Sequence, residues 1–107
     1  MNTIGLLNTS IITTEGNYTL KSITLDEARS IIKDKDLDSA IGHESTAKIM
    51  TTLLETPVKV NRQMFVQEVG QTCLVFKLNG RPEEGKILTQ KEIEEIGYKF
   101  QILLRNN

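Results

Sequence analysis

The stretch that decides the fold is Ser39-Ala40-Ile41-Gly42-His43-Glu44-Ser45-Thr46, in which a brief apolar strand passes directly into a helix. From His43 onward, one helical stripe collects apolar side chains, and the helix must stop before Pro57. The stripe consists of Ala47, Met50, Leu53 and Leu54. Alternation of strands with helices is typical of α/β proteins, in which helices pack on a sheet.

The N-terminal part of the chain predicts two strands and a helix. Residues Thr3 to Asn8 are typical of a buried strand, and a polar turn separates them from a second strand over Tyr18 to Ile23, which can pair back on the first. Thr24-Leu25-Asp26-Glu27 has the spacing of a capping box, so a helix is expected from there to about Lys33.

The C-terminal part continues the alternation. Glycine at position 70 predicts a hairpin between two strands, and a second capping box at Thr89-Gln90-Lys91-Glu92 predicts a third helix that ends at Gly97. The expected elements are a strand over Val58 to Gln67 with a break near Asn61-Arg62, a strand over Thr72 to Leu78, a loop over Asn79 to Gly85, and a strand over Tyr98 to Leu104.

Length and composition predict one domain over residues 1–107, because the 107-residue chain contains no proline-rich or glycine-rich divider. The expected fold is α/β, with a mixed sheet of about five or six strands flanked by about three helices. The lone Cys73 lies in an apolar run and is expected to be a buried thiol, as in proteins of the reducing cytoplasm. The sequence has neither a targeting signal nor a stretch long enough to span a membrane.

The charge balance bears on the class of ligand. Lysine and arginine number 13 against 14 acidic residues, a balance that argues against sequence-independent binding to long DNA or RNA. A small anion remains compatible with this balance, because two or three converging cationic groups are enough to bind one.

His43 is the centre of the predicted site. It sits with Gly42 where a strand meets a helix N-terminus, whose free amides favour phosphate, and Ser45 and Thr46 add hydroxyl donors. Two interpretations stay open. The histidine either caps the edge of the core, with its ring along the packed face, or serves as a general acid near a phosphodiester, a step worth about 10²- to 10⁴-fold in rate.

Three further charged residues are candidates for the same site. Arg81 and Glu84 share one loop, and Arg62 lies at the break in an earlier strand. The planar guanidinium of arginine suits phosphate because it donates two hydrogen bonds at once. Taken singly, each residue also fits an ordinary solvated charge.

Other chemistries have weaker support. One cysteine and one histidine cannot form a recognisable metal cluster, so no metal or other cofactor is expected. The sequence has no Walker loop and no Gly-x-Gly-x-x-Gly motif. A nucleophilic pair of Cys73 with His43 is conceivable, although Cys73 has the surroundings of a core residue.

Three blocks resemble, in order and spacing, the viral ring nucleases that inhibit type III CRISPR immunity, and especially their small relatives on bacterial mobile elements. The blocks are Ala40-Ile41-Gly42-His43-Glu44-Ser45-Thr46, then Asn61-Arg62, then Arg81-Pro82-Glu83-Glu84-Gly85-Lys86-Ile87-Leu88. The resemblance covers nearly the whole chain, starting with Leu7-Asn8-Thr9-Ser10.

The resemblance implies a homodimer that binds cyclic tetra-adenylate across its axis and opens the ring without a metal, leaving a 2′,3′-cyclic phosphate. His43 matches the general acid of the family, and Glu84 matches the glutamate that assists the attacking side or orients the catalytic groups. Arg62 and Arg81 match its phosphate-binding arginines. The twofold symmetry of such a ring suits an isologous dimer, which presents two copies of every group about one axis.

The chain departs from the viral pattern at a few positions. Many viral members carry aspartate where Glu44 stands and an aliphatic residue where Pro82 stands. Asn8, Thr9 and Ser10 fit either a ligand contact or ordinary capping and turn roles. A binding protein that holds the messenger without cutting it, and a regulatory dimer of a mobile element with a protein partner, remain alternative hypotheses.

Overall fold

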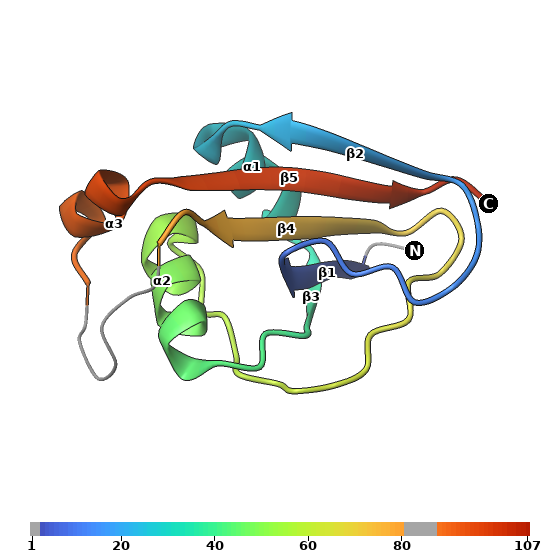
Figure 1. Ribbon diagram of the computed structural model, residues 1–107, viewed down its shortest axis with the longest axis horizontal. Helices are drawn as coiled ribbons and strands as arrows, with labels where there is room; N and C mark the ends of the chain where they lie inside the picture. The colour runs from blue at the N-terminus through green and yellow to red at the C-terminus, as the bar shows by residue number, and fades with distance from the viewer. Residues whose placement is uncertain (1–2, 81–87) are drawn as a thin grey trace.

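The computed structural model describes residues 3–80 and 88–107, which form a single α/β unit (Figure 1). Its five strands and three helices confirm the predicted fold class. The elements are β1 (Thr3–Asn8), β2 (Tyr18–Ile23), α1 (Leu25–Ile32), β3 (Asp36–Ser39), α2 (Glu44–Leu54), β4 (Thr72–Leu78), α3 (Gln90–Ile96) and β5 (Tyr98–Arg105). None of the helices in these residues is long and apolar enough to cross a membrane.

The sheet is mixed and has the order β2-β5-β4-β1-β3. Strand β1 lies parallel to both of its neighbours, with Leu6 opposite Ser39 of β3 and opposite Leu74 of β4. Strand β5 is antiparallel to β4, and the edge strand β2 is antiparallel to β5. The carboxyl ends of β1, β3 and β4 therefore meet at the same edge of the sheet.

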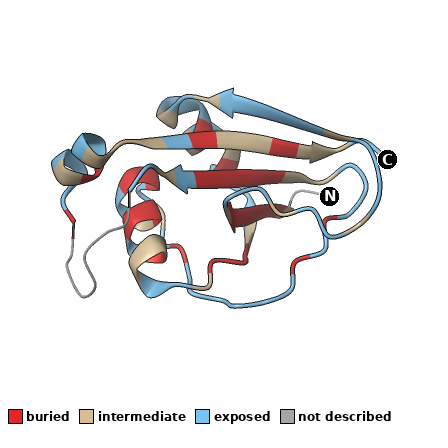
Figure 2. Ribbon diagram, viewed as in Figure 1, coloured by how far each residue is buried: buried red, intermediate tan, exposed pale blue. Residues whose placement is uncertain are grey.

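Each face of the sheet buries its own apolar cluster. On one face, the three helices cover side chains of the central strands, among them Leu6, Leu74, Phe76 and Phe100. On the other face, connecting segments rather than helices provide the cover, and Phe65 packs there with Leu7, Cys73, Val75 and Leu103. Figure 2 shows how the buried positions concentrate along β1, β4 and the middle of β5.

Both predicted capping boxes are confirmed. The Thr24 hydroxyl accepts the Glu27 amide at the start of α1, and Thr89 and Glu92 make the same pair of contacts at α3. Gly97 ends α3 with a φ of 89°, in the region where glycine is favoured. Local chemistry over four residues was enough to predict these helix starts.

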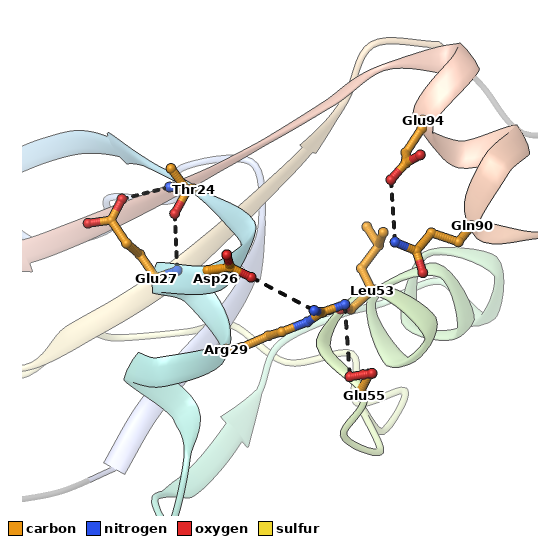
Figure 3. A network of polar contacts seen from close by, with 8 residues as sticks. All are labelled: Thr24, Asp26, Glu27, Arg29, Leu53, Glu55, Gln90 and Glu94. Carbon is orange, nitrogen blue, oxygen red and sulfur yellow. Dashed lines mark hydrogen bonds and ion pairs between the residues drawn. The ribbon is translucent and has the colours of Figure 1, made fainter.

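Helix α1 is fastened to the end of α2 by one arginine. Arg29 Nε donates to the Leu53 carbonyl at 2.9 Å, and its guanidinium also lies 4.0 Å from a Glu55 carboxylate oxygen and 3.9 Å from an Asp26 oxygen (Figure 3). The carbonyl belongs to the last turn of α2, where no later amide of the helix is available to donate a hydrogen bond to it. Arg29 thereby satisfies an otherwise orphaned acceptor and orients two helices at once.

The prediction of a strand over Val58 to Gln67 is wrong, because this segment pairs in no ladder. Both edges of β4 are already taken, by β1 and β5, so Gly70 cannot start a hairpin that brings the segment alongside β4. Side chains attach it to the outer strand instead. Asn61 Nδ2 and Gln63 Nε2 donate to the Ser39 carbonyl of β3, at 2.9 and 2.7 Å.

Several boundaries and one pairing also differ from expectation. The third strand covers Asp36–Ser39, so Ala40 and Ile41 follow it, and α2 begins one residue after His43. Strand β2 pairs with β5, not with the first strand, because β1 is already paired on both sides. Helix α1 ends at Ile32 and β5 extends to Arg105, each within a residue of the prediction.

The close fit of Phe65 on β1 yields a test of this packing. A Cβ added at Gly5 would lie 2.6 Å from Phe65 Cζ and 2.7 Å from Cys73 Sγ. We expect Gly5→Ala to lower the free energy of unfolding by about 1–3 kcal/mol in urea denaturation, because the core there has no room for a methyl group. The double variant Gly5→Ala/Phe65→Leu should lose less than the sum of its single variants. Additive losses would show that the Phe65 ring is not the obstacle.

Candidate functional site

The carboxyl edge of the three parallel strands gathers segments that are far apart in the sequence. Asn8 ends β1 and leads to Thr9 and Ser10, whereas Gly42 and His43 follow β3 after two buried residues. In open α/β sheets, ligands bind outside the carboxyl ends of the strands, where the connections diverge to opposite sides. Helices α2 and α3, which follow β3 and β4 in the chain, pack on the helical face, whereas the segment after β1 places Ile11 on the other face (Figure 1).

Arg62 lies against Gly42, although twenty residues separate the two in sequence. Arg62 Nη2 is 3.5 Å from the Gly42 carbonyl oxygen, and a Cβ at Gly42 would be 3.3 Å from Arg62 Nε. The Asn61 amide anchors this approach by donating to the Ile41 carbonyl at 2.8 Å. The structure thus brings one predicted arginine next to Gly42, the residue that precedes the predicted histidine.

His43 is exposed and is the N-cap residue of α2, a helix-entry position that is compatible with both interpretations of this residue. Its backbone carbonyl accepts the Ala47 amide at 3.1 Å, which starts the helix and leaves the imidazole at the surface. No described side chain caps α2, in contrast to α1 and α3. Amides in the first turn, which includes the half-buried Ser45 and Thr46, are therefore available to an anion.

Thr9 has an unusual backbone conformation. Its φ of 67° lies in the left-handed region, which costs a β-branched residue on the order of 1–3 kcal/mol. The Thr9 amide donates to the Phe76 carbonyl at 2.8 Å, so the strain occurs where β1 leaves the sheet. Such strain is concentrated at binding sites in proteins, which favours a ligand role for this exposed turn over a plain connecting role.

The structure adds a cationic pair that sequence analysis missed. Lys77 of β4 and Lys99 of β5 stand directly opposite each other, and both are exposed. Like charges in this arrangement destabilise a sheet, and neither lysine has an ion-pair partner in the part of the chain that the structure describes. Lys77 follows Phe76, the residue that accepts the Thr9 amide, so the pair lies towards the same edge. The opposition of these two lysines can be recognised only from the register of β4 and β5, not from the sequence.

The remaining candidates have different outcomes. Arg81 and Glu84 lie outside the described residues, which resume at Leu88. Cys73 is fully buried, and burial raises the pKa of its thiol to about 12. It is near the start of β4, whereas His43 follows the carboxyl end of β3, so the Cys73–His43 pair is not formed. Across residues 3–80 and 88–107, no three His, Cys, Asp or Glu side chains cluster as metal ligands.

Comparison with known proteins finds relatives in bacteria and in archaeal viruses. A family model described as STIV B116-like matches residues 4–100. The uncharacterized protein YddF of Bacillus subtilis (strain 168) is 36% identical over 104 residues, covering 95% of this chain and 96% of its own. The uncharacterized protein 26 of Sulfolobus islandicus filamentous virus is 37% identical over 81 residues, covering 75% of this chain and 69% of its own.

One solved structure is similar over nearly the whole chain. B116 of Sulfolobus turreted icosahedral virus superposes with a TM-score of 0.80 and 24% sequence identity, covering 95% of this chain and 98% of its own. At this identity, the likeness shows the fold alone. None of these proteins has a name that states an activity.

The strain at Thr9 can be measured. We expect Thr9→Gly to raise the free energy of unfolding by about 1 kcal/mol, because glycine removes the cost of the left-handed conformation. Ser10→Gly is the matched control, since Ser10 is not among the residues with positive φ. That control should lose about 0.5–1 kcal/mol through the greater freedom of glycine in the unfolded chain. Equal losses for the two variants in urea denaturation would contradict the strain.

Proposed function

This chain belongs to the STIV B116-like family, which is found in archaeal viruses and bacteria, and on that premise we propose that it is a metal-independent ring nuclease. Its substrate is cyclic tetra-adenylate, and opening the ring in the cytoplasm switches off type III CRISPR signalling. The observation that carries the proposal is the contact of Arg62 with Gly42, which unites two of the three sequence blocks beside an uncapped helix start.

Phosphate recognition follows from the groups at this edge. Arg62 and the first amides of α2, with the hydroxyls of Ser45 and Thr46, supply donors for one phosphate. Asn8, Thr9 and Ser10 face the substrate from the end of β1, and Arg81 supplies a second guanidinium. Because the binding groups are local, a net charge of −1 is no obstacle to a small polyanion.

Ring opening is a transesterification within the substrate. The ribose 2′-oxygen attacks the adjacent phosphorus, the bond from phosphorus to the 5′-oxygen breaks, and a 2′,3′-cyclic phosphate forms. His43 donates a proton to the leaving 5′-oxygen, and Glu84 supports the attacking side, where the 2′-hydroxyl loses its proton. An exposed imidazole is suited to this exchange, because it can be protonated again from solvent between turnovers.

A homodimer is part of the same proposal. A cyclic tetranucleotide can have twofold symmetry, so two copies of Arg62 and of the α2 helix start can meet it about one axis. The groups on one copy contact only part of the ring. Two copies enclose the substrate from both sides.

A binding protein that holds the messenger without cutting it is the second candidate. One observation favours it: among the described residues, no side chain or carbonyl accepts a hydrogen bond from the His43 imidazole. A catalytic histidine is commonly oriented by such a partner. The two candidates differ in turnover, not in affinity.

Incubation with cyclic tetra-adenylate in EDTA distinguishes the two candidates. We expect chromatography to show a linear product with a 2′,3′-cyclic phosphate. An intact ring after long incubation with excess protein, together with tight binding, would instead establish the binding protein.

Variants separate catalysis from binding. His43→Ala should abolish cleavage yet bind the ring nearly as well, because the proton donor acts only in the transition state. Arg81→Ala should weaken binding by about 10- to 100-fold, because this is the typical contribution of a charged hydrogen bond to affinity. Lys91→Ala, on the exposed surface of α3, is the matched control and should change neither quantity. Normal cleavage by His43→Ala would remove the histidine from the mechanism.

A further inference from the structure

Within the segment between Val58 and Gly70, residues Met64 to Glu68 alternate between exposed and buried like a strand, although they belong to no sheet. Phe65 and Gln67 point inward and are each 3% exposed, whereas the intervening side chains point outward. Met64 is 85% exposed and Val66 is 57% exposed. We call the four outward residues the outer strip: Arg62, Met64, Val66 and Glu68.

The backbone of this segment is also unpaired. Within residues 3–80 and 88–107, the amides of residues 62–67 have no hydrogen-bond acceptor. The inward carbonyls are bound, since Phe65 accepts the Thr13 hydroxyl and Gln67 accepts Arg105 Nη1. An extended segment with free amides and exposed apolar side chains is a template for another strand.

The outer strip is complementary to itself. If two copies pair antiparallel with Phe65 opposite Phe65, Met64 faces Val66 of the second copy and Arg62 faces Glu68 of the second copy. Each of these contacts occurs twice by symmetry, as in an isologous interface, and no like charges oppose each other. We infer that residues 62–68 form the interface of a homodimer. The backbones of residues 63–67 pair antiparallel with the same residues of a second copy, and Arg62 meets Glu68 of the second copy through side chains, because the Glu68 backbone is hydrogen-bonded to Gln71.

This inference rests on the proposed function for its consequence at the site. Among the described residues, the guanidinium of Arg62 has only the 3.5 Å contact with the Gly42 carbonyl, too long to fix its orientation. Glu68 of the second copy would hold the guanidinium from the other side. Arginine has five donor hydrogens, so enough remain for a phosphate. Glu68 is therefore a positioning residue, and each site is complete only in the dimer.

Cysteine pairs test the register directly. In the double variant Met64→Cys/Val66→Cys, the new thiol at position 64 of one copy lies opposite the new thiol at position 66 of the second copy. The two Cα atoms are then at the separation that a disulfide requires. Mild oxidation should convert most of the protein into covalent dimers. The matched control Leu20→Cys/Ser22→Cys, on the exposed edge strand β2, should stay largely uncrosslinked. Cys73 remains silent in both because it is buried.

A charge swap tests the pairing without new bonds. Glu68→Arg alone, and Arg62→Glu alone, should each raise the dimer dissociation constant at least about 10-fold in sedimentation experiments, because like charges then face each other. The double variant Arg62→Glu/Glu68→Arg should restore dimerisation. A wild-type monomer, or a dimer that none of these changes weakens, would overturn the inference. Cleavage of the ring by a wild-type dimer that none of these changes weakens would overturn this interface and still uphold the proposed function.

Discussion

Strand β1 is bound on both edges by parallel strands, and the rest of the molecule depends on this arrangement. Since parallel strands place their carboxyl ends together, the turn at Thr9 and the strand-to-helix junction at His43 must share an edge. Since both edges of β1 and of β4 are filled, neither β2 nor the segment after Pro57 can pair with them. Strand β2 instead extends the sheet beyond β5, and the segment after Pro57 covers the face of the sheet that carries no helices.

The groups that stabilise the fold and the groups of the candidate site are different residues. The buried faces of the sheet, two capping boxes and Arg29 stabilise the fold, and none of them belongs to the candidate site at the carboxyl edge. Unfavourable features collect at that edge: a strained threonine, an uncapped helix start and two opposed lysines. Proteins keep such local costs where a ligand compensates them, and here the well-packed remainder of the domain provides the margin.

Sequence analysis succeeded where a few neighbouring residues decide the outcome and failed where distant ones do. Thr24 and Glu27 interact across a single turn, so the spacing alone predicted the start of α1. In the range Val58 to Gln67, burial alternates only from Met64 to Gln67, and this alternation reports burial on one side and not a pairing partner. The contact of Arg62 with Gly42 and the opposition of Lys77 and Lys99 are products of topology and register, which periodicity does not encode.

The segment after Pro57 connects stability with the site because adjacent residues on it face opposite ways. Phe65 closes the second core by resting on Gly5, and Asn61 ties the segment to the end of β3. Arg62 lies between Asn61 and Phe65 in the chain. Its distance from Gly42 therefore depends on how these two residues pack, although neither belongs to the candidate site. A loosened Phe65 would therefore move Arg62, the proposed phosphate-binding group, without altering any group in the candidate site. The unpaired amides from 62 to 67 leave the same segment free to contact another chain, so one irregular stretch covers the core, carries the arginine and presents the outer strip.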